Sequence, residues 1–203
     1  MSWSPPRALY QVMELVEIYR RSLAEFSDRV RQVGPDQWGG PTPCTDWDVR
    51  ALVNHVVGED RWTAPMLAGQ TIAEVGDRFD GDLLGADPAT ATADAVAEAD
   101  RAVAEPGALG RTVRLSFGDT PAEEYVRQLL ADHLVHAWDL AVAIGADRTL
   151  DPAVVSACAE WYADREDMYR QAGAVAAKVT VPDGASDQDR LLGAFGRDPA
   201  WKP

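Results

Sequence analysis

The amino-acid sequence predicts an all-α protein built as a four-helix bundle with long crossover connections and minor short strands. Apolar residues recur at steps of three and four over several long segments, which is typical of helices with one buried face. These segments begin at capping residues that are often followed by proline, and they tend to end at glycine. Strand-type alternation is short and weak, so helices are expected to supply the core.

The first helix is expected over residues 6–33, because one stripe of its surface is apolar. That stripe consists of Leu9, Val12, Met13, Val16, Tyr19, Leu23, Phe26 and Val30. Gly34 and Pro35 end the helix, since glycine is favoured just past a helix end and proline cannot continue one.

The second helix is expected to start at Thr45, which would cap it, with Asp48 as the capping-box partner three positions later. Its apolar face carries Leu52, Val53 and Val56. Pro65 should kink or end the helix, because proline lacks the backbone N–H that the next turn needs. Residues 69–86 are expected to form a long loop of the kind that often lines a site.

A third helix is expected after Asp87, which caps it, with Pro88 in its first position. Residues 111–117 alternate weakly between apolar and polar side chains. They are therefore expected to form a short strand or an extended connection.

The fourth helix is expected over residues 121–144. It is preceded by a cap, a proline and a capping-box partner, which are Thr120, Pro121 and Glu123. Gly145 should close it, because glycine adopts the left-handed conformation that commonly ends a helix.

The remaining elements are a fifth helix and a mixed tail. Asp151 and Pro152 open the fifth helix, which is expected to continue through Met168. In the tail, residues 178–181 are expected to form a strand, and Ser186 should cap a short last helix.

The composition fits one domain over residues 1–203, with a short C-terminal appendage at about 175–203. Hydrophobic residues make up 46% and charged residues 26% of the chain, as in ordinary soluble globular proteins. The net charge of −14, without a basic patch, argues against nucleic acid and an anionic membrane surface as partners. A small-molecule substrate is expected instead, and exposed apolar residues on the first helix would permit a homodimer.

A cytoplasmic location is expected. No stretch approaches the ~20 apolar residues that a membrane span requires, and the N-terminal residues lack the basic and apolar regions of a signal peptide. Cys44 and Cys158 should then be free thiols. Cys44 precedes a helix N-terminus, where the helix dipole would lower its pKa, but no base can be placed beside it. Both cysteines are therefore interpreted as packed residues.

The three histidines of the chain predict a metal site. His55 falls on the second helix, and His133 and His136 fall on the fourth. Asp132 lies four residues before His136, so these two side chains point the same way. A carboxylate and an imidazole from one helix, joined by an imidazole from another, can form a three-ligand site with an open fourth position. The candidate ligands are therefore His55, Asp132 and His136.

Two further residues leave alternatives open. His133 lies near the middle of the apolar face of its helix, so it is either a further metal ligand or a hydrogen-bonded core histidine. In the second interpretation, Asp132 and His136 are surface residues. Glu59 follows His55 by one turn on the same side. It could orient the imidazole, act as a general base, or be a solvated carboxylate.

Three segments of the chain resemble a known family. They are PTPCTDWDVRALVNHVVGEDRW at 41–62, DHLVHAWDLAVAIG at 132–145 and QDRLLGAFGRDPAW at 188–201. Together they resemble the actinobacterial metal-binding branch of the DinB-like superfamily, which is related to the N-terminal domain of mycothiol-dependent maleylpyruvate isomerase. The resemblance spans nearly the whole chain, and it implies a DinB-like four-helix bundle.

The resemblance also implies a divalent metal, usually zinc, bound by two histidines and a third ligand. Carried onto this sequence, the histidines are His55 and His136. Asp132 stands where the isomerase has a glutamate four residues before its histidine, and it is one methylene shorter. His133 is the reserve candidate for the third ligand. A second departure is expected at the end of the chain, near residue 203, where the isomerase's full C-terminal domain is expected to be missing, so only the metal and thiol chemistry are carried over.

The function expected from these features is that of an enzyme using Zn²⁺ as a Lewis acid, with mycothiol or a similar low-molecular-weight thiol as cosubstrate. The reaction would be a thiol-dependent isomerisation or an S-transfer, and Glu59 is the candidate proton shuttle. One alternative is a metal-dependent hydrolase that uses zinc-bound water. The other is a non-catalytic protein that binds a metal or a small molecule.

Overall fold

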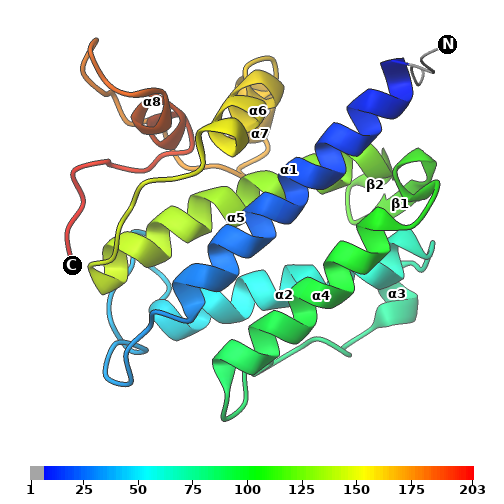
Figure 1. The fold of residues 1–203 in the computed structure, drawn as a ribbon, viewed down its shortest axis with the longest axis horizontal. Coiled ribbons are helices and arrows are strands. Elements are labelled where there is room, and N and C mark those ends of the chain that lie inside the picture. Colours follow the sequence, from blue (N-terminus) through cyan, green and yellow to red (C-terminus); the bar gives the residue numbers. More distant parts are fainter. Residues whose placement is uncertain (1–6) are drawn as a thin grey trace, which may run out of the picture.

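Four long helices form a bundle in the computed structural model (Figure 1), and they are α1 (Arg7–Val30), α2 (Val49–Leu67), α4 (Pro88–Ala104) and α5 (Ala122–Ile144). The structure describes the backbone of residues 7–203 and the side chains from residue 14 onward. The all-α prediction is confirmed. Of the stripe predicted for the first helix, Leu9, Val12 and Met13 lie outside the described side chains, and Tyr19, Leu23, Phe26 and Val30 are buried.

The order of the helices around the bundle explains its long crossover. Helix α1 packs against α5 and α4, and α2 packs against the same two helices. In Figure 1, α1 and α5 run in one direction while α2 and α4 run in the other. Since α2 and α4 are parallel and consecutive, the chain between them must return along the whole bundle. This segment is mostly loop, as predicted, but it contains the short helix α3 (Ile72–Val75), which a capping box of Thr71 and Glu74 begins.

Helix α2 starts later than predicted. Its cap is Asp48, whose side chain accepts a hydrogen bond from the Ala51 backbone N–H at 2.8 Å. The prediction of Thr45 as the cap is wrong, because residues 46–48 extend the loop and Asp48 also forms a bridge with Pro41. Pro65 lies within the last turn, close to the end of the helix at Leu67, as predicted.

A β-hairpin joins α4 to α5. Strand β1 (Thr112–Leu115) pairs antiparallel with β2 (Gly118–Pro121), and the 3₁₀ turn η1 (Ala108–Gly110) precedes them. The strand predicted at 111–117 is thus confirmed, but Thr120 does not cap α5. It pairs with Val113 inside the hairpin, so the strand continues up to the first turn of the helix.

Helix α5 is the most enclosed element of the bundle. Helices α1 and α2 pack on it, and α6 (Pro152–Tyr162) packs on it as well. Its middle therefore buries polar side chains together with apolar ones, including His133, His136 and Asp139. Gly145 ends α5 with a φ of 70°, the left-handed conformation expected at that position.

The C-terminal part is less regular than predicted. Asp151 caps α6 as expected, but the helix ends at Tyr162, and a separate helix, α7 (Glu166–Gln171), follows a turn. The single helix predicted through Met168 is therefore wrong. No strand forms at 178–181, where Val179 N–H donates only one backbone hydrogen bond, to the Gly193 carbonyl. Ser186 caps α8 (Asp187–Ala194), as predicted.

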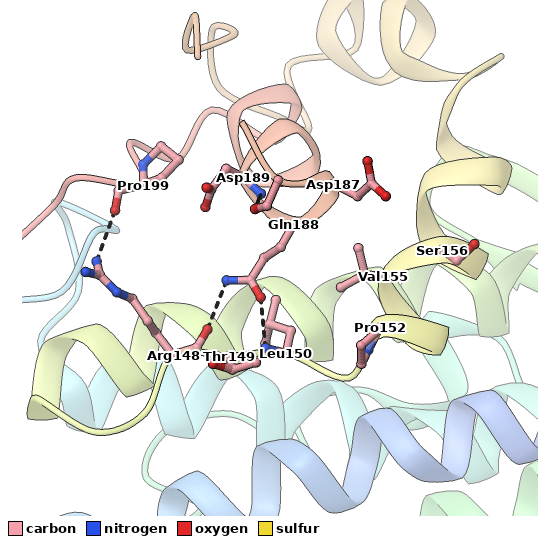
Figure 2. Close-up of a pocket in the computed structure, with 11 residues that line it drawn as sticks. Arg148, Thr149, Leu150, Pro152, Val155, Ser156, Asp187, Gln188, Asp189 and Pro199 are labelled. Carbon is pink, nitrogen blue, oxygen red and sulfur yellow. Dashed lines mark hydrogen bonds between the residues drawn. The ribbon is translucent and has the colours of Figure 1, made fainter. Parts of the chain in front are cut away.

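Polar contacts dock α8 onto the chain between α5 and α6, as Figure 2 shows. The Gln188 amide accepts from Leu150 N–H at 2.9 Å and donates to the Arg148 carbonyl at 3.0 Å. Arg148 in turn donates to the Pro199 carbonyl at 3.1 Å. These bonds line a cavity of about 570 Å³. The same hydrogen bonds bring the last residues of the chain, including Arg197, back to the side of the bundle. Within residues 7–203, no helix is both long enough and apolar enough to cross a bilayer.

Candidate metal centre

The packing of α2 against α5 brings together three of the predicted ligands. His55 Nε2 lies 3.2 Å from Asp132 Oδ2, and His136 Nε2 lies 3.3 Å from Asp132 Oδ1. The two imidazole rings are 5.2 Å apart, centroid to centroid. One ligand atom from each residue falls within 4.8 Å of the others. Two imidazole nitrogens and a carboxylate at this separation form a donor set that suits a divalent metal.

One atom of this cluster has no ordinary partner. Asp132 Oδ2 is shielded from solvent and, although His55 Nε2 lies 3.2 Å away, it accepts no hydrogen bond of regular geometry from the described residues. Burial alone would raise the pKa of Asp132, but the imidazoles of His136 and His55 lower it well below its usual range. A shielded carboxylate oxygen without a hydrogen-bond donor is costly unless a cation satisfies it. The residues present therefore fit a metal ion.

The cluster is accessible from one side. The side chains of His55 and Asp132 are 28% and 30% exposed, whereas that of His136 is only 7% exposed. Trp47 covers another side, since its ring lies 4.5 Å from the His55 ring and 5.7 Å from the His136 ring. Three protein donors with a partly open face match the geometry of a catalytic rather than a purely structural metal site.

Asp139 determines which nitrogen of His136 faces the cluster. It is fully buried and accepts a hydrogen bond from His136 Nδ1 at 3.0 Å. The Nδ1 proton is therefore held by Asp139, and Nε2 is the ring nitrogen that faces Asp132. Burial by itself would lower the pKa of His136, but Asp132 and Asp139 raise it well above its usual value.

Arg197 and Cys44 complete the surroundings of Asp139. Arg197 Nη2 lies 2.9 Å from Asp139 Oδ2 and 3.0 Å from Cys44 Sγ, and Cys44 Sγ lies 3.4 Å from the same carboxylate oxygen. Burial alone would raise the pKa of Asp139, but His136 and Arg197 lower it. Cys44, His136 and Asp139 could also hold a metal by distance alone. The Arg197 guanidinium already carries a positive charge against those atoms, so the His55 cluster is the better candidate.

Sequence reasoning missed the roles of Asp139 and Arg197. Asp139 lies three residues after His136, a spacing that places both on one helix face, so the signal was present in the sequence. Arg197 lies in the third of the resembling segments, but no local pattern connects it to residues 44 or 139. The sequence places no base beside Cys44, whereas the structure brings Asp139 Oδ2 to 3.4 Å and Arg197 Nη2 to 3.0 Å from its sulfur, because the C-terminal chain folds back over that residue.

His133 is not brought to the cluster. Its ring is completely buried between Tyr19 and Phe26, with Nδ1 2.5 Å from the Leu129 carbonyl and Nε2 3.0 Å from Asp60 Oδ1. Both nitrogens face acceptors, so both carry protons and the ring pairs with Asp60 as an imidazolium. Burial alone would lower the pKa of His133, but Asp60 raises it above the usual value. This arrangement corresponds to the core-histidine alternative.

Glu59 lies on the same side of α2 as His55, one turn later. Burial, and then the charge of Asp132, raise the pKa of Glu59, against the opposing effect of His55 and His133. A carboxyl group with a raised pKa beside a candidate metal is a candidate for accepting and returning a proton. The role of Glu59 as a proton shuttle stays a prediction.

A cavity of about 290 Å³ adjoins the cluster on the side of the C-terminal helices, and Asp132, His136 and Arg197 contribute to its lining. The larger cavity of Figure 2 is lined by none of the candidate ligands. The smaller cavity is therefore the space in which a molecule could reach the candidate metal centre.

Comparisons with known proteins point to one family. The family model "Mycothiol maleylpyruvate isomerase N-terminal domain" matches residues 19–141. Two proteins of Mycobacterium tuberculosis, from strain CDC 1551 / Oshkosh and strain ATCC 25618 / H37Rv, are named "Uncharacterized protein". Each is 35% identical to this chain over 144 residues, which cover 69% of this chain and 72% of the relative.

A solved structure agrees with the fold. The crystal structure of the mycothiol-dependent maleylpyruvate isomerase superposes with a TM-score of 0.65 at 16% identity, over 93% of this chain and 90% of that chain. The predicted bundle is confirmed.

Proposed function

The chain belongs to the family of the mycothiol maleylpyruvate isomerase N-terminal domain, and from this premise we propose that it is a zinc-dependent enzyme of thiol-assisted isomerisation or S-transfer. The observation that carries the proposal is the cluster of His55, Asp132 and His136, whose donor atoms lie within 4.8 Å of one another. The thiol cosubstrate would be mycothiol or a molecule with similar chemistry.

The metal would be held by His55 Nε2, His136 Nε2 and a carboxylate oxygen of Asp132. When bound, a divalent ion supplies Lewis acidity and lowers the pKa of a thiol that takes its open position. The shielded and unpartnered Asp132 Oδ2 supports this assignment, because a metal would satisfy an atom that no described residue does.

The protein's own residues would orient and protect the reacting groups. Asp139 keeps the proton on His136 Nδ1, so that Nε2 remains a donor atom for the metal. Trp47 lies against both histidine rings and keeps water from that side. Glu59 would accept the proton of the incoming thiol and return it at the end of the reaction.

The chemistry follows from a thiolate next to an electrophile. In isomerisation, the thiolate sulfur adds to one carbon of an electrophilic double bond, the carbon–carbon bond rotates, and the sulfur leaves with its electron pair. In S-transfer, the new carbon–sulfur bond persists and a leaving group departs with its electrons. Both reactions need the same arrangement of thiol and acceptor, which is why one site serves either reaction.

The proposal is tested by combining metal, thiol and electrophile. Zinc-loaded protein would be incubated with mycothiol and either a conjugated cis-alkene or a chloromethyl-type electrophile, with chelator-treated protein and the His55→Ala variant as controls. We expect turnover only when metal and thiol are both present. Turnover of an ester without thiol would point to a hydrolase instead. Zinc binding without any turnover would leave a non-catalytic metal protein.

A further inference from the structure

The cavity beside the candidate metal centre has one wall formed by α5. Gln128, Asp132 and His136 follow one another at intervals of four residues on that helix and all line the cavity. Residues four apart lie along one stripe, and eight residues of helix span about 12 Å. The cavity therefore runs along two turns of α5, with Gln128 toward one end and His136 toward the other.

The other walls are aromatic. The rings that line the cavity are Phe117, Trp161, Tyr162, Tyr169 and Phe195. Several of them pack on one another: Tyr162 stacks on Phe195 at 4.1 Å, and Trp161 meets Tyr169 edge-to-face at 5.6 Å. Rings held in this way form a preformed surface that favours another flat apolar group.

A partly buried polar contact fixes the orientation of two of these rings. Glu124 accepts from Trp161 Nε1 at 3.0 Å and from the Tyr169 hydroxyl at 3.2 Å. Arg165 Nε lies 3.3 Å from Glu124 Oε1 and neutralises its charge. The guanidinium of Arg165 also lies over the Trp161 ring. The polar atoms of both aromatic side chains are thus already satisfied within the protein. A ligand in the cavity would meet mainly their apolar surfaces.

The charge of the cavity is limited. Among the described residues that line it, Arg197 is the only one with a permanent positive charge, and its guanidinium is paired with Asp139. His136 also lines the cavity, and it is paired with Asp132 and Asp139. In the metal-free protein, a ligand carrying two carboxylates would therefore find no unpaired cation for its second carboxylate among the described lining residues, and burying an unpaired charge is costly.

Phe117 forms part of the entrance. It lies in the turn between β1 and β2, and although it lines the cavity it is 71% exposed. Its ring extends the aromatic lining of the cavity out to the solvent. The hairpin thus places one more ring over the mouth of the cavity.

We propose that this cavity binds the second, non-thiol substrate, and that this substrate has a planar apolar body and at most one negative charge. The planar body would lie among the rings of Phe117, Trp161 and Tyr169, and the carboxylate or carbonyl end would lie toward Arg197 and His136. This inference rests on the proposed function, because it identifies the acceptor of that same site. The volume of about 290 Å³ suits a molecule with a single aromatic ring.

The first experiment compares trans-cinnamate, which has one ring and one carboxylate, with fumarate, which has two carboxylates and no ring. Binding of each to the full-length protein would be followed by calorimetry and ligand-detected NMR, with and without zinc. We expect saturable cinnamate binding at least about tenfold tighter than fumarate binding, and measurable without the metal because the rings contribute directly. Equal binding of the two, or tighter fumarate binding, would overturn the proposal.

Two exposed positions test the location without threatening the fold. Phe117→Ala should weaken cinnamate binding about fivefold, since one aromatic contact is lost, whereas Ile72→Ala, an exposed apolar residue outside the cavity, should leave it unchanged. Ala174→Trp should block the mouth, and Ala172→Trp, exposed but not lining the cavity, is its control. Unchanged binding in both cavity variants would place the ligand elsewhere.

The outcomes separate this inference from the proposed function. Cinnamate binding at this cavity in a protein that never takes up zinc would overturn the proposed function and leave the cavity assignment standing. Zinc binding with thiol-dependent turnover, but no cinnamate binding, would overturn the cavity assignment and leave the proposed function standing. Complete displacement of cinnamate by mycothiol in the metal-free protein would assign the cavity to the thiol and so contradict the inference.

Discussion

Asp139 Oδ2 lies 3.0 Å from His136 Nδ1 and accepts a hydrogen bond from it. This bond turns the Nε2 atom of the same ring toward Asp132. The buried carboxylate of Asp139 thus decides how His136 on α5 faces α2. Arg197, which belongs to the C-terminal chain, holds that carboxylate in turn at 2.9 Å. The candidate metal centre therefore depends on three segments that lie far apart in the sequence, which are α2, α5 and the C-terminal chain.

The first prediction concerns the metal itself. We expect protein purified without chelator to contain about one zinc per chain. His55→Ala and Asp132→Ala should lose it, because each removes one of three donors, while Asp132→Glu should keep it. Elemental analysis by mass spectrometry measures the content. Folded wild-type protein that takes up no zinc, even when zinc is offered, would contradict the assignment.

Asp139→Asn tests the orientation of His136. The amide is nearly the same size, but it does not attract the Nδ1 proton as a carboxylate does, so zinc affinity should fall about 10- to 100-fold. Competition with a coloured zinc chelator measures the affinity. Asp164→Asn changes an exposed aspartate of similar size and serves as the control. An unchanged affinity in Asp139→Asn would mean that the bond does not act on the metal.

The buried pair of His133 and Asp60 predicts a pH-dependent stability. Because Asp60 raises the pKa of His133 in the folded protein, the pair stabilises the fold fully below the unfolded pKa of about 6.5. That contribution is lost as the pH rises through the higher folded pKa. In metal-free protein at pH 6, Asp60→Asn should lower the free energy of unfolding by about 3 kcal/mol.

Urea unfolding at several pH values provides the test. His136 titrates in both the wild type and Asp60→Asn, so its effect cancels in the difference between the two. We expect this difference to shrink as the pH increases above neutrality. A difference that stays constant or grows with pH would show that His133 is neutral in the folded protein.

The two cysteines should differ in reactivity. Burial raises the pKa of Cys158 to about 12, so its thiolate is rare and inaccessible at pH 8. Cys44 is partly exposed and lies beside the Arg197 guanidinium. Iodoacetamide should therefore label Cys44 first in the native protein, and both cysteines in urea, as peptide mass spectrometry would detect. Faster labelling of Cys158 in the native state would contradict the described packing.

Glu59→Gln tests the proton shuttle. The amide cannot carry a proton, so turnover should fall about 100-fold in an established thiol-dependent assay while the zinc content stays the same. A shift in the pH profile of kcat should accompany the loss, because the raised pKa of Glu59 is removed. Glu160→Gln, on α6, provides the control. Turnover equal to that of the wild type would exclude this role.

Local patterns predicted the features that depend on neighbours in the sequence. The caps at Asp87, Asp151 and Ser186 bond to the first turn of their own helices, so their residue types were sufficient. The pairing of Asp132 with His136 likewise follows from helical geometry. Predictions failed where a distant partner decided the outcome: Thr120 entered a strand because Val113 lies opposite it.

The sequence by itself determined that the chain is a helical bundle and that two helices carry candidate metal ligands, since side-chain periodicity and capping are local properties. Tertiary structure alone decided which histidine joins His55. The wheel of α5 placed His133 most inward, but Asp60 and the Leu129 carbonyl occupy both of its nitrogens. Tertiary structure also brought Arg197 to Asp139, because that contact joins residues 58 positions apart through packing that no local pattern encodes.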